Sequence, residues 1–148
     1  MAFIQPCFIR KNTPELRKKL EDLGYLSPSK MWYDENFAIC VFWRDNNGEY
    51  LIYEIDDDFE RIIAPNYPFI DCGTNEELFL ALAALRDDTN ENQWFIAQRT
   101  MWDENYNGEI TVYYEEGEWL LWDYYSFMED MPSDFRKATV EEIIEYFK

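Results

Sequence analysis

The segment closest to a known chemical motif is rich in side-chain oxygens. Residues 103–110 match the opening of an EF-hand calcium loop at its first, third, fifth, sixth and eighth positions. Asp103, Asn105 and Asn107 would supply the metal ligands. The twelfth position, where a bidentate glutamate should close the site, is Tyr114, and the residues before it favour a strand over a helix. We therefore prefer an Asx-rich hairpin turn ending in Asn-Gly, with an irregular calcium site as the alternative.

Other catalytic signatures are missing. The sequence has no histidine, which removes the commonest general base and the commonest transition-metal ligand. None of its serines lies in a Gly-x-Ser-x-Gly turn, and its five glycines are scattered rather than gathered into a phosphate-binding loop. Acid pairs such as Asp87-Asp88 are too common among 31 acids to single out a glycosidase site. The sequence predicts no cofactor, and an enzyme with an unrecognised carboxylate or metal site ranks third among the hypotheses.

Charge and aromatic content distinguish this chain. It carries 31 acidic and 13 basic side chains, for a net charge of −18, together with 11 Phe, 11 Tyr and 6 Trp. Residues 1–30 hold six basic and three acidic groups, so the balance there is +3 and the remaining 118 residues carry −21. Such a surface repels phosphate and acidic membranes and attracts basic proteins. We expect a basic protein partner, with no direct binding of nucleic acid or membrane.

Two segments concentrate acids that a partner could contact. One follows a predicted strand near residue 55; the other, residues 113–125, combines glutamates with aromatic rings. The second strand of the latter would carry Trp119 on one face and Trp122 and Tyr124 on the other. Burial of both faces is the preferred interpretation, and an aromatic interface rimmed by acids is the alternative. The candidate partner-binding residues are Asp56, Asp57, Asp58, Glu60, Glu115, Glu116, Glu118, Trp119, Trp122 and Tyr124.

Helices are predicted where capping residues precede an apolar stripe. Pro14 suits a first helical position, and Gly24 ends that helix. In the last helix, Thr139 and Glu142 form a capping box. The three predicted helices begin after Asn12 or Thr13, after Thr74 or Asn75, and after Thr139.

Strands are predicted where apolar runs end in turn residues. Asn47-Gly48 closes a first hairpin and Glu116-Gly117 a second. Because hairpins dominate, the chain predicts one α+β domain over residues 1–148, with about three helices and a largely antiparallel sheet. The predicted strands are 37–43, 50–55, 93–98, 110–114 and 119–125.

The sequence around the first hairpin is echoed later in the chain. Trp43 and Trp102 each precede an Asn-Gly-Glu triplet and an apolar strand. A weak internal α-β-β repeat would explain the likeness. Hairpins converge easily on such sequences, so independent origin is the preferred interpretation.

Cysteine usage and the N-terminus indicate a compartment. Cys7, Cys40 and Cys72 are odd in number and lie in apolar contexts, which favours buried free thiols in a reducing environment. The first residues lack the basic start and cleavage site of a signal peptide. The longest apolar run, Leu78 to Leu85, is far shorter than the roughly 20 residues that span a bilayer. We expect a cytoplasmic protein.

Two stretches carry a resemblance to other proteins. Residues 71–88 with 93–95, and residues 134–144, resemble segments of small uncharacterised proteins carried by prophages and mobile elements of gut bacteria. The resemblance implies a mobile-element setting, where small acidic proteins often act as inhibitors or immunity factors. It implies no catalytic residues.

The leading hypothesis is a non-enzymatic acidic binding protein. It would act as an inhibitor or nucleic-acid mimic that blocks a basic, nucleic-acid-handling protein, because dense carboxylates imitate phosphates and speed association with a basic groove. A structural or assembly protein of a phage or mobile element is the alternative. Neither the partner nor the oligomeric state follows from the sequence.

Overall fold

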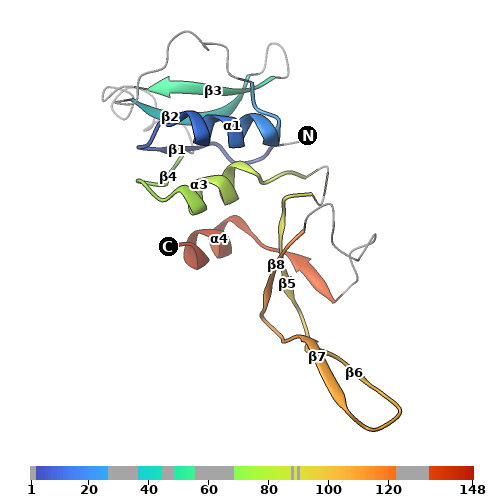
Figure 1. The fold of residues 1–148 in the computed structure, drawn as a ribbon. Coiled ribbons are helices and arrows are strands. Elements are labelled where there is room, and N and C mark those ends of the chain that lie inside the picture. Colours follow the sequence, from blue (N-terminus) through green and yellow to red (C-terminus); the bar gives the residue numbers. More distant parts are fainter. Residues whose placement is uncertain are drawn as a thin grey trace.

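The computed structural model describes residues 3–26, 37–44, 49–55, 69–87, 89, 91–122 and 134–148. This part of the chain has an α+β fold with three helices and several antiparallel pairs of strands, which confirms the predicted class (Figure 1). In chain order the elements are β1 (Cys7–Ile9), α1 (Pro14–Leu23), β2 (Ala38–Arg44), β3 (Glu49–Ile55), β4 (Ile70–Asp71), α3 (Glu76–Ala83), β5 (Trp94–Ala97), β6 (Met101–Glu104), β7 (Ile110–Tyr114), β8 (Trp119–Leu121), β9 (Phe135–Lys137) and α4 (Val140–Tyr146).

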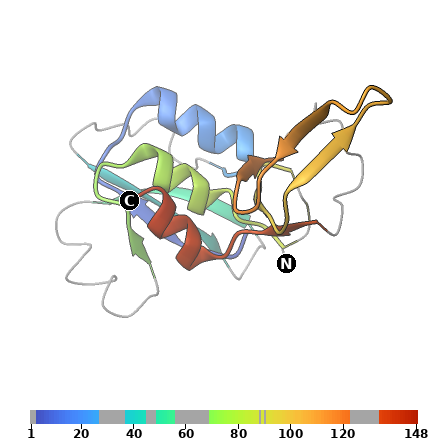
Figure 2. The ribbon, with the colours of Figure 1, turned by 90° about the horizontal axis from the view of Figure 1, so that it is seen from below.

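A four-stranded sheet in the order β3-β2-β1-β4 carries the main core. Strand β1 is antiparallel to β2 and parallel to β4, and β2 is antiparallel to β3. Side chains alternate across the sheet, so Ile9, Ile39 and Ile52 join the main core while Phe8 and Cys40 form a smaller cluster. The three helices lie side by side on one side of the sheet (Figure 2). Their fully buried contributions to the core are Leu16, Leu20, Phe79, Leu82, Ala83 and Ile143.

Each helix begins where its capping residue satisfies a free backbone amide. The Thr13 hydroxyl accepts a hydrogen bond from the Leu16 amide (3.1 Å), and Asn75 Oδ1 accepts one from the Leu78 amide (3.1 Å). Helix α4 has the predicted capping box between Thr139 and Glu142. The three predicted helix starts are therefore confirmed. Of the two alternatives predicted for each of the first two N-caps, the structure has Thr13 and Asn75.

The second predicted hairpin is wrong in its pairing. Strand β7 pairs with β6 and not with β8, while β8 pairs with β5 in a separate sheet of order β8-β5-β9. The turn at Gly117 instead lies beside the end of β5, where the Gly117 amide donates to the Ala97 carbonyl (2.8 Å). Two chain segments, residues 94–104 and 110–121, thus run antiparallel to each other. Their outer parts pair as β6 and β7, and their inner parts pair as β5 and β8 in a different sheet. The pairing differs from the prediction because β6, an exposed strand that was not predicted from the sequence, pairs with β7 in place of β8.

The repeated hairpin sequences differ in pairing. Trp43 lies opposite Tyr50, whereas Trp102 lies opposite Val112, two residues further along than the sequence alignment requires. The first hairpin also belongs to the four-stranded sheet, while the β6-β7 pair forms a sheet of its own. The likeness of the two segments therefore does not extend to their strand register.

The cysteine prediction is confirmed for the side chains. Cys7, Cys40 and Cys72 are buried free thiols. Burial raises the pKa of the Cys40 thiol to about 12, so it stays protonated and unreactive near neutral pH.

Candidate protein-binding ribbon

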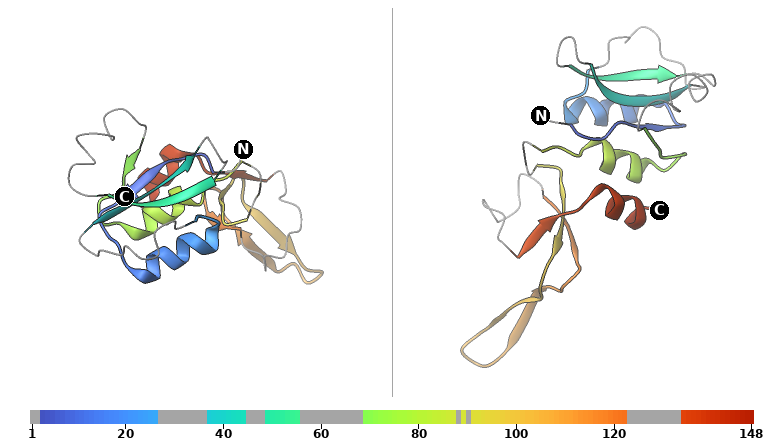
Figure 3. Two further views of the ribbon diagram at one scale, coloured as in Figure 1. Left: turned by 90° about the horizontal axis from the view of Figure 1, so that it is seen from above. Right: turned by 180° about the vertical axis from the view of Figure 1, so that it is seen from behind.

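Residues 101–118 form a ribbon that projects away from the helices, in which β6 pairs with β7 and residues 115–118 make the turn at the base (Figures 1 and 3). Every residue from 102 to 113 is exposed. In the part of the chain that the structure describes, no third strand pairs with β6 or β7. An isolated pair of strands buries little apolar surface, so its conformation depends on its turn and on its attachment.

The tip of the ribbon is held by one asparagine. Asn105 Oδ1 accepts hydrogen bonds from the amides of Asn107 (2.9 Å) and Glu109 (3.0 Å), and the Gly108 amide donates to the Asn105 carbonyl (3.0 Å). Gly108 has a φ of 80°, a conformation that glycine adopts without strain. This geometry is that of an Asx-type hairpin turn.

The predicted calcium ligands lie in and beside this turn. The Asn105 side-chain oxygen is directed at two backbone amides, and Asp103 Oδ1 accepts a hydrogen bond from the Glu104 amide (2.9 Å). Within the described ranges, no group of three or more His, Cys, Asp or Glu side chains is arranged to hold a metal. Binding of calcium by Asp103, Asn105 and Asn107 stays a prediction that solution experiments can test.

One face of the ribbon is apolar. Trp102 lies opposite Val112, and Glu104 lies opposite Ile110, so these four side chains share a face. Trp102, Ile110 and Val112 are 57%, 64% and 49% exposed. Single exposed apolar residues are normal, but adjacent ones on a projecting strand pair are typical of a surface that binds another protein.

The ribbon is also uniformly acidic. Residues 101–118 contain six acids and no base. No ion pair involves any of these six in the described part of the chain. The nearest base along the chain, Arg99, is bound in two hydrogen bonds by Asp134 (2.6 and 3.0 Å), which raise the pKa of Arg99. The acids are Asp103, Glu104, Glu109, Glu115, Glu116 and Glu118.

The base of the ribbon is anchored to the sheet that contains β5. The Glu116 amide donates to the Thr100 hydroxyl (3.2 Å), and the Ala97 amide donates to the Glu118 carbonyl (2.9 Å). The Tyr114 ring packs edge-on against Phe135 on β9, with centroids 5.1 Å apart. These contacts fix where the ribbon leaves the body while leaving its apolar face uncovered.

Nine of the ten predicted partner-binding residues divide into three groups, and Trp122 lies apart from them. Glu115, Glu116 and Glu118 are exposed at the base of the ribbon. Trp119 is half-buried and stacks on Tyr146, with centroids 4.1 Å apart. The remaining predicted residues, Asp56, Asp57, Asp58, Glu60 and Tyr124, lie outside the described residues.

Trp122 needs a correction. It is only 7% exposed and packs against Phe95, with ring centroids 6.3 Å apart, so it belongs to the core and not to a binding surface. Burial of Trp122 was the preferred interpretation of the sequence, and the structure agrees with it.

The apolar residues of the ribbon were not predicted as binding residues from the sequence. They are Trp102, Ile110 and Val112, with Tyr106 at the tip and Tyr113 on the other face. A signal was present, since Ile110 and Val112 alternate with more polar positions, which predicts a strand with one apolar face. Whether that face is covered depends on the next strand in space, and the alternation does not give that strand.

No protein-family model, curated protein or solved structure matches this chain. Among the helices that the structure describes, none is long and apolar enough to cross a membrane.

Proposed function

We propose that this protein is a non-enzymatic binding protein whose ribbon docks on a basic, nucleic-acid-handling partner and blocks it. The observation that carries the proposal is an exposed, largely apolar strand face on a projecting pair of strands whose charged side chains are all acidic. The acids and the apolar side chains would have separate roles.

The acids would bring the partner to the ribbon. Six carboxylates without an opposing base add to a net charge of −18, so a basic groove is attracted at long range and association is accelerated. Because exposed charges are screened beyond about 8 Å at physiological ionic strength, this contribution should fall steeply with added salt.

The apolar face would hold the partner once it has arrived. Trp102 is the largest exposed side chain on that face, and tryptophan is among the residues that contribute most to protein interfaces. The Asx turn at Asn105 already fixes the tip, so less conformational entropy is lost on binding than for a disordered loop.

A second candidate function rests on the open edges of β6 and β7. In the described part of the chain both edges lack a neighbouring strand, so a partner could add a strand through backbone hydrogen bonds. Such pairing would suit a structural or assembly protein of a phage or mobile element. It depends on backbone groups, so it should depend less on salt than binding through the acids.

Two variants with equal net charge test the first candidate. The ribbon variant is Asp103→Asn/Glu104→Gln/Glu109→Gln, and the matched control is Glu15→Gln/Glu21→Gln/Glu141→Gln, which removes three exposed helix charges. Captured basic partners are identified from host lysate, and their affinities are measured with and without competing DNA. The ribbon variant should bind about tenfold more weakly or worse, corresponding to at least ~1.4 kcal/mol, while the control stays near the wild type.

Two results would contradict the proposal. Equal losses in both variants would show that the total charge matters and the ribbon does not. Failure of DNA to compete would show that the partner's nucleic-acid site is not the one covered.

A further inference from the structure

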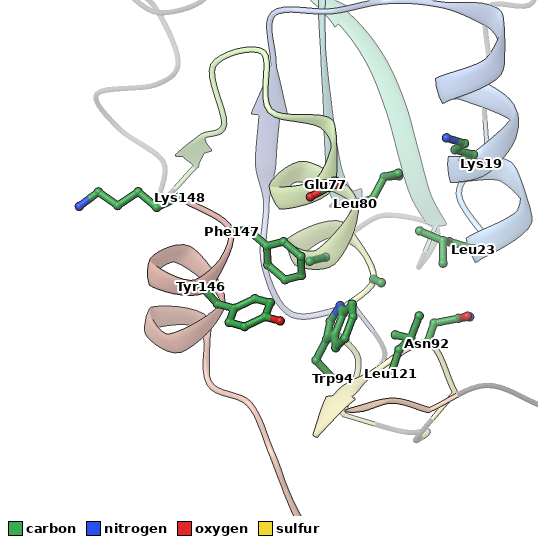
Figure 4. Close-up of a pocket in the computed structure, with 12 residues that line it drawn as sticks. Lys19, Leu23, Glu77, Leu80, Asn92, Trp94, Leu121, Tyr146, Phe147 and Lys148 are labelled. Carbon is green, nitrogen blue, oxygen red and sulfur yellow. The ribbon is translucent and has the colours of Figure 1, made fainter. Parts of the chain in front are cut away.

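A cavity of about 770 Å³ lies at a distance from the ribbon tip, between α1, α3, α4 and the start of β5 (Figure 4). Its volume is within the roughly 300–1,000 Å³ typical of small-molecule sites. The walls are mainly apolar and aromatic, from Leu23, Leu80, Trp94, Leu121, Tyr146 and Phe147.

Small side chains on α3, between larger side chains on α1 and at the end of α4, leave the space of the cavity. Ala81 and Ala84 on the α3 side leave space between Leu23 of α1 and Phe147 at the end of α4. Buried Gln93 fixes this floor, because its Nε2 donates hydrogen bonds to the carbonyls of Ala84 (2.6 Å) and Glu91 (3.0 Å). The end of α3 is thereby tied to the start of β5, and the cavity is a preformed feature of the fold.

The indole of Trp94 carries an unused hydrogen-bond donor. Figure 4 shows its nitrogen directed into the cavity, next to the Phe147 ring, whose centroid lies 5.4 Å from that of Trp94. No acceptor for this N–H is found among the described residues. Because no buried side-chain nitrogen or oxygen among the described residues lacks a partner, this N–H is open to solvent, and the acceptor of a ligand would replace water there.

The charges around the cavity disfavour an anionic ligand. Lys19 lies 3.0 Å from Glu76 and Lys148 lies 3.8 Å from Glu145, so each cation at the rim has a carboxylate beside it. Glu77 at the rim and the net charge of −18 would repel a carboxylate. An ammonium ligand could pair with the Glu77 carboxylate at the rim, but beside Trp94 it would place its own N–H groups against the indole donor.

We propose that this cavity binds an uncharged small molecule that contains a ring and a carbonyl group. The ring lies against the wall formed by Trp94, Tyr146 and Phe147, and the carbonyl oxygen accepts the hydrogen bond from Trp94 Nε1. This site is separate from the ribbon and does not rest on the function proposed above.

Four probes with the same carbon skeleton test the ligand class: benzylacetone, butylbenzene, phenylbutyrate and phenylbutylamine. Binding is followed through the indole N–H resonances in NMR spectra of isotope-labelled protein. Benzylacetone should bind most tightly and shift the Trp94 indole resonance downfield. Because one hydrogen bond contributes about 0.5–1.5 kcal/mol, its affinity should exceed that of butylbenzene by roughly 2–12-fold.

A variant separates the hydrogen bond from the ring contact. Trp94→Phe removes the donor and keeps an aromatic wall, so it should abolish the advantage of benzylacetone while changing butylbenzene binding by no more than about twofold. The matched control is Trp102→Phe, which alters an exposed tryptophan of the ribbon that does not line the cavity. The control should keep the advantage.

Three results would overturn the inference. They are the absence of saturable binding by benzylacetone to the wild-type protein, an advantage that persists in Trp94→Phe, or tighter binding of either charged probe. The wild-type titration decides the first and third of these even if Trp94→Phe does not fold.

Discussion

Replacing Ile143 by alanine should destabilise the protein far more than the same change at the next residue, Ile144. Ile143 is fully buried in the main core, whereas Ile144 is half-buried at its margin. The substitution removes three carbons, so lost transfer free energy at Ile143 amounts to about 2.4 kcal/mol at ~0.8 kcal/mol each. An unfilled cavity of about 45 Å³ would add about 1 kcal/mol at ~24 cal/mol per Å³. The expected loss is therefore about 3–4 kcal/mol for Ile143→Ala and about 1 kcal/mol for Ile144→Ala.

Urea denaturation followed by circular dichroism measures this difference. With a slope of about 1–3 kcal/mol per M, the midpoint of Ile143→Ala should fall by roughly 1–4 M, with the slope unchanged. Ile143→Val, which removes a single carbon, should recover most of the loss, leaving about 0.5–1.5 kcal/mol. Equal shifts at the two positions, or a shift below about 0.5 M at Ile143, would show that α4 does not dock on the sheet as described.

Four further predictions concern charge, metal, the ribbon and a turn. Hydrogen bonds from Arg136, and then from the Thr139 amide, lower the pKa of Glu142 to about 2. Since this folded pKa is below the unfolded value of about 4.5, Glu142 stabilises the fold above pH ~4.5, and the destabilisation caused by Glu142→Gln should disappear as the pH falls toward 2 in thermal melts. Excess calcium should raise the melting temperature by less than about 5 °C relative to chelator, because backbone amides already occupy the Asn105 oxygen; a larger rise would restore the calcium site. Trp102→Ser should change the free energy of unfolding by less than about 0.5 kcal/mol yet abolish partner capture; a large loss of stability would place Trp102 in the core. Gly117→Ala should cost about 1 kcal/mol, because φ is +88° although the space around it is open; no change in the melting temperature would contradict that strain.

Local features of the fold could be predicted from the sequence. The capping box of Thr139 and Glu142 and the first-turn Pro14 involve residues within one helical turn of each other, so their spacing alone determines the hydrogen bonds. The burial of the three cysteines follows similarly from their apolar neighbours. These predictions needed no knowledge of which elements meet in space.

Strand pairing could not be predicted because two turn signals compete for β7. Asn107-Gly108 and Glu116-Gly117 both suit a reversal of the chain, and the choice depends on which segment can serve as a partner strand. In Met101–Glu104 two apolar residues are followed by two acids, so the segment lacks the apolar–polar alternation that predicts a strand. This absence of alternation accompanies the exposure of three of its four residues. The same exposure concealed Trp102, Ile110 and Val112 as candidate binding residues.

Solubility alone explains the acids of the ribbon less well than binding does. Two strands with open edges and an apolar face would tend to pair with a second copy of the chain, and like charges on such strands oppose that pairing. The acids therefore reduce self-association of the protein. However, a surface selected only for solubility has no need of Trp102, Ile110 and Val112 side by side on a projecting strand pair. Acids that repel another copy while attracting a basic partner, around apolar residues that such a partner would cover, fit both observations at once.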